Sequence, residues 1–286
     1  MLLMQMPFRP LFLVCGMFLL SVSAVFGQVG DSHSTAVNAE SDTVDIVYIG
    51  DSITYGGLLH SPDTQAPPVV CTELLRNRLP KTSFFMSNQG RNGHTTVDVL
   101  PSSNLDFPKI EEAATHLQVE HPGRLVFSIM LGTNDSAESG PNGSPVSAEK
   151  YGENLRTITS RLLLEYPESV VIINRPSWYS PNTHNGAIYD KPGLDRLQTY
   201  FSVITSVVRS FSGAPDRVYE GDTTAFDYFA SHYQTDLSPE EGHEGTFYLH
   251  PDVQGAQALG ELWSTAIADV LERHNRTTSD HPKVSK

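Results

Sequence analysis

The feature that most constrains the fold of this chain is the alternation of short apolar runs with helical stripes. Four runs are rich in apolar and β-branched residues, and a weaker one follows: 44–49 (VDIVYI), 83–86 (SFFM), 125–131 (LVFSIML), 170–173 (VVII) and 217–219. Near-continuous apolar runs of this length are typical of strands that are buried on both faces of a parallel sheet. The sequence therefore predicts a mainly parallel sheet.

Segments with the periodicity of amphipathic helices lie between these runs. One covers 69–79, a second begins after Ser147 as N-cap, a third extends from about Leu194 to 208, and the last begins at Pro251. We expect Pro251 to lie in the first turn of the last helix, where proline is best tolerated. Without a repeat or a long internal linker, the pattern predicts one α/β domain, a doubly wound sheet flanked by helices with right-handed crossovers.

The first 27 residues have the pattern of a secretory signal peptide. A single basic residue, Arg9, precedes an apolar run at 11–20, and small residues follow up to Gly27. The run is short for a membrane span, and a retained N-terminal anchor is the alternative. We therefore divide the chain into a signal peptide (1–27), a flexible lead-in (28–42), one folded domain (43–275) and a flexible tail (276–286), and we expect export to the periplasm or the medium.

Charge and cysteine content narrow the range of partners. The chain has 19 Lys and Arg residues against 33 Asp and Glu, a formal net charge of −14. Phosphate contacts require clustered basic residues, so we expect no nucleic-acid partner and, once the signal is removed, no membrane partner. Of the two cysteines, Cys15 lies in the predicted signal peptide, and Cys71 alone forms no intrachain disulfide. The oligomeric state stays open.

Polar and glycine-rich motifs follow three of the predicted strands, where doubly wound sheets bind their ligands. They are GDSIT at 50–54, NQGRNGHTT at 88–96 and GTND at 132–135, and a His-Pro pair follows at 250–251. Acyl transfer requires a nucleophile, a base and oxyanion donors at one point. Ser52 offers the hydroxyl and His250 the base, while the N–H groups of Ser52 and Gly93 and the amide of Asn134 offer three oxyanion donors. Each motif alone is ordinary loop chemistry, but together, and in this order, they predict a catalytic site.

At these residues the sequence resembles the SGNH hydrolases, the GDSL-type esterases, from Gly50 to the final helix. The resemblance implies a flavodoxin-like α/β/α sandwich and ester hydrolysis through an acyl-serine intermediate, without a cofactor. It also implies that Ser52 is the nucleophile, that Ser52, Gly93 and Asn134 form the oxyanion hole, and that His250 is the base. Segments 132–136 and 175–183 resemble exported bacterial members associated with carbohydrate deacetylation.

One departure from the family pattern concerns the acid of the triad. The family places an aspartate three residues before the histidine, where this chain has Phe247. Either a backbone carbonyl orients His250 in a Ser-His dyad, which we favour, or an acid from the preceding stretch does so. The acids available there are Asp236, Glu240, Glu241 and Glu244.

Three further residues are candidates for contact with the substrate. His94 lies beside the proposed oxyanion glycine and either lines the pocket or faces solvent. The aromatic residues Trp178 and Tyr179 follow the fourth apolar run, a placement that suits stacking on a sugar and packing over the core equally well. The acidic, loop-like stretch with His232, His243 and Glu244 has no spacing typical of a metal site, so we expect none.

The sequence thus favours an exported serine esterase that removes small acyl groups, acetyl first among them, from a small or polymeric carbohydrate ester. The polar segments 136–145 and 180–191 favour a hydrophilic substrate. The alternatives are a lipid-type esterase, lysophospholipase or thioesterase, and a carbohydrate-binding relic of the fold, which the Phe247 departure would support.

Overall fold

The computed structural model describes residues 42–184, 186–213 and 216–280. Its centre is a five-stranded sheet in which every neighbouring pair is parallel, in the order β2-β1-β3-β4-β7. These strands are β1 (Asp42–Gly50), β2 (Thr82–Gly90), β3 (Arg124–Met130), β4 (Val170–Ile173) and β7 (Val218–Glu220). All five apolar runs therefore form strands, and the predicted doubly wound α/β fold is confirmed.

Two antiparallel hairpins stand outside this sheet. They are formed by β5 (Asn182–His184) with β6 (Ile188–Asp190), and by β8 (Leu237–Gly242) with β9 (Gly245–Pro251). The sequence predicted neither of them, and both lie among residues that it described as loops.

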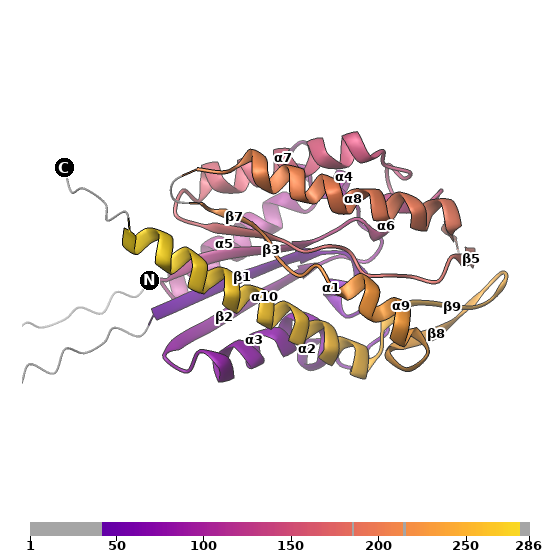
Figure 1. The fold of residues 1–286 in the computed structure, drawn as a ribbon, viewed down its shortest axis with the longest axis horizontal. Coiled ribbons are helices and arrows are strands. Elements are labelled where there is room, and N and C mark those ends of the chain that lie inside the picture. Colours follow the sequence, from indigo (N-terminus) through magenta and orange to yellow (C-terminus); the bar gives the residue numbers. More distant parts are fainter. Residues whose placement is uncertain (1–41, 185, 214–215, 281–286) are drawn as a thin grey trace, which may run out of the picture. The chain divides into compact units, whose positions relative to one another are not determined.

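Helices cover both faces of the sheet (Figure 1), with α3 and α10 on one face and α5, α7 and α8 on the other. The helices are α1 (Ser52–Tyr55), α2 (Pro62–Gln65), α3 (Pro67–Arg78), α4 (Thr96–Val99), α5 (Phe107–Glu120), α6 (Thr133–Ser136), α7 (Ala148–Glu165), α8 (Lys191–Ser210), α9 (Ala225–Asp236) and α10 (Val253–Asp280), with a 3-10 turn η1 (Pro101–Ser103). Among these described helices, none is long and apolar enough to cross a bilayer.

The packing of β1, an interior strand of the sheet, follows from the alternation of its side chains. Tyr48 of β1 is buried, stacks on Trp263 of α10 with ring centroids 6.0 Å apart, and bonds through its hydroxyl to Cys71 and Thr72 of α3. One residue of β1 therefore joins the two helices on that face. Cys71, predicted to be a buried small residue, is fully buried and free.

The helix starts agree with the sequence only in part, since α3 begins at Pro67 and α8 at Lys191, a few residues before the expected 69 and 194. The side chain of Ser147 accepts from the Lys150 N–H and caps α7, as predicted. Pro251, however, ends β9, and α10 begins only at Val253. The expectation that Pro251 lies in the first turn of the helix is therefore wrong. The side chain of Asp252 caps the helix instead, because it accepts from the N–H groups of Gln254 and Gly255 at 2.9 Å.

The predicted signal peptide at 1–27 lies outside the described residues, and so does the lead-in up to residue 41. Asp42, which we had placed in the lead-in, is the first residue of β1. At the other end α10 continues to Asp280, past the expected domain boundary at residue 275.

Candidate active site

The order of the strands places the first three sequence motifs at one edge of the sheet. The carboxyl ends of β1, β2 and β3 lie in register, with Gly50 opposite Gly90 on one side and Met130 on the other. Chain connections leave β1 and β3 in opposite directions in this strand order, and such a switch point is where doubly wound sheets bind ligands. Ser52 follows β1, and Asn134 follows β3.

A close approach of backbones brings the serine onto the strand ends. A Cβ atom at Gly90 would lie 2.3 Å from the Tyr55 nitrogen, so only glycine lets α1 sit directly against the end of β2. Asp51 caps α1 by accepting from the Ile53 N–H at 2.9 Å. Ser52 is the first residue of this helix, where a backbone N–H has no partner inside the helix and is available to a ligand.

Ser52, His250 and Glu240 form a continuous chain of short contacts. The Ser52 Oγ lies 2.8 Å from His250 Nε2, and His250 Nδ1 lies 2.8 Å from Glu240 Oε1. A carboxylate only accepts hydrogen bonds, so Nδ1 carries the proton of the neutral ring and Nε2 is free to accept from the serine hydroxyl. This is the geometry of a nucleophile, a base and an orienting acid.

The favoured expectation of a backbone carbonyl as the orienting group does not hold, because Glu240 takes that position. Of the other acids considered, Asp236 is buried and accepts from the hydroxyls of Tyr228 and Thr235, whereas Glu241 and Glu244 are exposed. The four acids differ in this way because they do not belong to one loop: Asp236 ends α9, and Glu240 lies in β8.

The β8–β9 hairpin explains how an acid reaches His250 although Phe247 stands at the family's acid position. Glu240 and Phe247 are direct cross-strand partners. The ladder also shifts register between Leu237 and Pro239, opposite the residues that include His250. Such bulges redirect side chains, which agrees with His250 and Glu240 meeting although simple alternation would separate them. His250 thus sits in a strand, not at a helix start.

Asn134 is held by two hydrogen bonds at the start of α6. Its Nδ2 donates to the backbone carbonyl of His94 at 2.9 Å, and its Oδ1 accepts from the Tyr189 hydroxyl at 2.5 Å. Since Nδ2 carries two hydrogens, one N–H remains for a ligand. The bond to His94 ties the third motif to the second, which contains Gly93. Gly93 has φ +75°, and a Cβ atom there would meet nothing within 4 Å, so the space on the side-chain side of this residue is open.

Two buried carboxyl groups lie beside these residues. Burial raises the pKa of Asp51 to about 6 and that of Asp135 to about 7. Asp135 accepts from both the N–H and the hydroxyl of Thr96, and Thr96 accepts from Asn154 of α7. These hydrogen bonds join Thr96, the last residue of the second motif and the first of α4, to Asp135 in the third motif.

The candidates for substrate contact have different positions. The His94 ring is partly exposed, and its Nδ1 lies 2.5 Å from Asp106 Oδ2. Trp178 is half-buried and packs against Tyr233 with ring centroids 5.1 Å apart. Tyr179 is completely buried and bonds through its hydroxyl to Ser136 at 3.1 Å, so of its two alternatives packing in the core holds and contact with the substrate does not.

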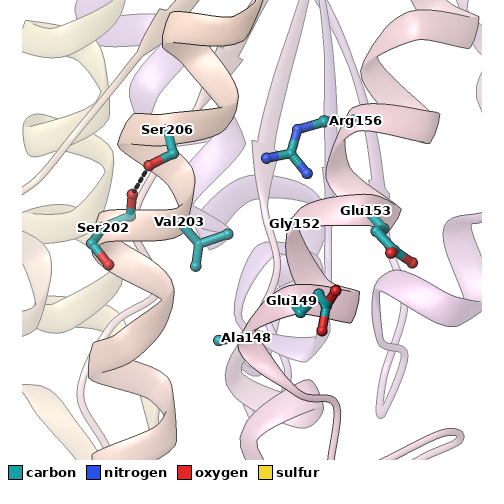
Figure 2. A pocket seen from close by; sticks show the side chains of 8 residues that line it. All are labelled: Ala148, Glu149, Gly152, Glu153, Arg156, Ser202, Val203 and Ser206. Atoms are coloured by element: carbon teal, nitrogen blue, oxygen red, sulfur yellow. Dashed lines mark hydrogen bonds between the residues drawn. The ribbon is translucent and has the colours of Figure 1, made fainter.

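Within the described residues, no group of three or more His, Cys, Asp or Glu side chains is placed to hold a metal ion. A hollow of about 450 Å³ lies between α7 and α8. Figure 2 shows Glu149, Glu153 and Arg156 on one wall of this hollow and Ser202 and Ser206 on the other. None of its lining residues belongs to the strand-end motifs.

Sequence reasoning missed two residues of the site, Tyr189 and Gly57. Tyr189 belongs to a three-residue strand in a segment that the sequence described only as polar. Gly57 packs against both catalytic candidates, since a Cβ atom there would lie 3.3 Å from Ser52 Cβ and from His250 Cδ2. The Gly-Gly pair at 56–57 was the available signal for the second.

A serine–histidine–carboxylate chain at the carboxyl ends of the strands of a parallel sheet places this protein in the class of α/β hydrolytic enzymes. Residues 48–258 match the model of the GDSL-like lipase/acylhydrolase family, and the chain belongs to this family. The resemblance inferred from the sequence is therefore confirmed, and the family makes the chain a carboxylic ester hydrolase.

Similar solved structures support the fold. A carbohydrate acetylesterase from Sinorhizobium meliloti is 16% identical, with a TM-score of 0.51 over 79% of this chain and 99% of that one. The aryl esterase of M. smegmatis is 16% identical, with a TM-score of 0.52 over 79% and 98%. A mutant of an acetyl-xylooligosaccharide esterase from Geobacillus stearmophilus is 20% identical, with a TM-score of 0.52 over 78% and 93%. No curated protein sequence matches the chain significantly.

Proposed function

We propose that this protein is an exported serine esterase that hydrolyses small acyl esters, acetyl first among them, on a carbohydrate. The observation that carries the proposal is the chain of two 2.8 Å contacts from Ser52 through His250 to Glu240. Export rests on the signal-like pattern of residues 1–27 alone.

In the proposed reaction the Ser52 oxygen attacks the ester carbonyl while its proton passes to His250 Nε2. The carbonyl oxygen becomes an oxyanion that the N–H groups of Ser52, Gly93 and Asn134 stabilise. His250 then protonates the sugar oxygen as its bond to the acyl carbon breaks, so that the sugar leaves with a free hydroxyl and the acyl group stays on Ser52. Water, deprotonated by His250, attacks this acyl-serine and releases the acid, with the proton returning to Ser52. Glu240 stabilises the imidazolium in both halves.

The nucleophile is tested by labelling with a fluorophosphonate. We expect the wild-type protein to be labelled and to lose activity, and Ser52→Ala to show neither labelling nor turnover. If the wild-type protein is not labelled, or if Ser52→Ala is labelled equally, the proposal is wrong.

The role of Glu240 is tested by Glu240→Gln, with Glu241→Gln as the matched control on the same strand. Loss of an orienting acid costs roughly 10⁴-fold in kcat where the triad depends on it. We expect a loss of that order for Glu240→Gln and an unchanged kcat for the control, because Glu241 is exposed. Equal activity of the two variants would refute the assignment.

Two observations support an active esterase for acetylated sugars, the first concerning the substrate and the second concerning catalysis. Two of the similar structures are described as acting on acetylated carbohydrate esters, at identities of 16% and 20%. In addition, the lack of an acid at residue 247 was the one feature that favoured a carbohydrate-binding relic. Because Glu240 contacts His250 in place of that acid, this feature no longer favours the relic.

One observation favours the alternative of a more apolar ester. Leu58 is 60% exposed, has φ 67°, and directly follows Gly57, which packs against the Ser52–His250 pair. An exposed leucine held in a left-handed conformation costs free energy, and such strain is concentrated at functional sites. Leu58 would suit an apolar acyl chain.

Rates on acetyl and octanoyl p-nitrophenyl esters, followed by acetate release from acetylated xylan and pectin, discriminate these functions. We expect faster turnover of the acetyl ester and release of acetate from at least one polysaccharide. Faster turnover of the octanoyl ester, with its preference abolished in Leu58→Ser, would replace the carbohydrate proposal by the lipid-type one.

A further inference from the structure

The carboxamide of Asn134 has a fixed orientation for a chemical reason. The backbone carbonyl of His94 can only accept a hydrogen bond, so the amide edge that faces it must be the nitrogen. The oxygen of the amide therefore faces Tyr189, whose hydroxyl must donate. The Tyr189 hydroxyl and the His94 carbonyl together determine which way the remaining N–H of Asn134 points.

Tyr189 is well placed to hold that orientation. Its side chain is almost completely buried, stacks on Phe247 with ring centroids 5.8 Å apart, and meets Tyr179 edge to face at 5.3 Å. Burial raises the pKa of its hydroxyl well above the ordinary value, so the group stays protonated and remains a donor at neutral pH.

The backbone around Tyr189 is tied to the segment that carries Asn134. Ile188 exchanges backbone hydrogen bonds with the residues that follow α6, accepting from Glu138 at 2.8 Å and donating to Ser139 at 3.0 Å. Asp190 caps α8 by accepting from the Gly193 N–H. The residues on both sides of Tyr189 are thus anchored.

Phe247, which stands where the family has its aspartate, is also the residue on which the Tyr189 ring stacks. Its ring is fully buried and forms one wall of the site in which Tyr189 sits, while its cross-strand partner Glu240 reaches His250. The residue at the family's acid position thus supports an oxyanion donor through Tyr189, and the acid comes from the neighbouring strand.

We infer that Tyr189 is a positioning residue of the esterase site, which acts through Asn134 on the oxyanion. Its hydroxyl holds the amide so that the free N–H points to the reaction centre, and it polarises the amide, which strengthens that N–H as a donor. This inference rests on the proposed function, because it requires an oxyanion that forms at Ser52.

The test compares Tyr189→Phe with Tyr179→Phe as matched control. Both variants keep a buried ring and lose a buried hydroxyl, but the Tyr179 hydroxyl bonds to Ser136 and not to Asn134. We expect Tyr189→Phe to lower kcat on p-nitrophenyl acetate by roughly 10- to 100-fold, below the 10²- to 10³-fold typical for loss of an oxyanion donor, with KM within threefold. The control keeps kcat within threefold. Circular dichroism verifies the fold of each.

A double-mutant cycle separates positioning from a structural role. In the Asn134→Ala background Tyr189→Phe should have almost no further effect on kcat, because the group through which it acts is absent. The rate of phosphonylation of Ser52 by a fluorophosphonate should follow the same pattern, since the P=O oxygen uses the same donors. Additive losses, or an unchanged kcat in Tyr189→Phe, would overturn the inference.

Failure of the inference is distinguishable from failure of the proposed function. If Ser52→Ala retains full activity, the proposed function is wrong and the Tyr189 measurements refer to another reaction. If Ser52→Ala is inactive and Tyr189→Phe has the kcat of the wild-type protein, the proposed function is supported and the inferred role of Tyr189 is wrong.

Discussion

Asp45 is a carboxyl group within β1, an interior strand of the sheet. It is fully buried, and neither of its oxygens has a hydrogen-bond partner within the described part of the chain. Its register partners on the neighbouring strands are Phe85 and Leu125, so hydrophobic side chains flank it on both sides. Such a site disfavours the charged form. We predict that Asp45→Asn stabilises the protein increasingly as the pH rises.

The magnitude follows from the pKa of Asp45, which burial raises from 3.8 to about 6. Between these values the unfolded chain releases the proton while the native state keeps it, so the native state loses stability as the pH rises. The loss begins near pH 4 and is complete near pH 7. At 1.36 kcal/mol for each pH unit, it reaches at most about 3 kcal/mol. The amide of asparagine does not titrate, so the variant escapes this loss.

Urea unfolding of both proteins at several pH values between 4 and 8 measures the effect. The free energy of unfolding of Asp45→Asn, relative to wild type, should rise by about 2 to 3 kcal/mol across this range. Asp51 and Asp135 also have raised pKa values, but they are common to both proteins and cancel in the difference. A difference that stays constant from pH 4 to 8, whatever its sign, would refute the reasoning.

Two glycine substitutions test the packing around the site. Gly57→Ala places a methyl group 3.3 Å from the His250 ring, so we expect kcat to fall by roughly tenfold with little change in melting temperature, whereas Gly213→Ala, in open surroundings, leaves both unchanged. Equal kinetics in the two variants would contradict this. Gly90→Ala forces a methyl group to within 2.3 Å of the Tyr55 nitrogen. We expect the free energy of unfolding, measured in urea, to fall by about 1 to 3 kcal/mol. Unchanged stability would show that α1 can move away from β2 without cost.

The central sheet was predictable because the information that specifies it is local. Strands buried on both faces need continuous apolar runs, and each of the five runs formed a strand. The motifs at 50–54 and 132–135 were then placed correctly by a rule of topology. Helix α5 carried an equally clear stripe of Phe107, Ile110, Ala114 and Leu117, all buried, which the sequence analysis did not use.

The hairpins were not predictable in the same way. Strand β8 reads LSPEEG, with a proline, two glutamates and a glycine, all of which are depleted in strands. Its conformation is imposed by pairing with β9, so the tertiary structure overrides local propensity. Tyr189 was hidden for the same reason, because nothing local to the three-residue strand β6 indicates a contact with Asn134.

The acid of the triad could not be found from its distance to His250 along the sequence. Directly opposed residues of an antiparallel pair have their Cβ atoms roughly 5 Å apart, so a carboxyl group can be supplied from either strand at little cost in reach. Here the family's position holds Phe247, and its partner Glu240 carries the acid. An aspartate at residue 247 would bury a charge against Tyr189 and remove the ring that supports it. The two cross-strand partners therefore divide two tasks between them: Glu240 orients the base His250, and Phe247 supports Tyr189, which holds the oxyanion donor Asn134.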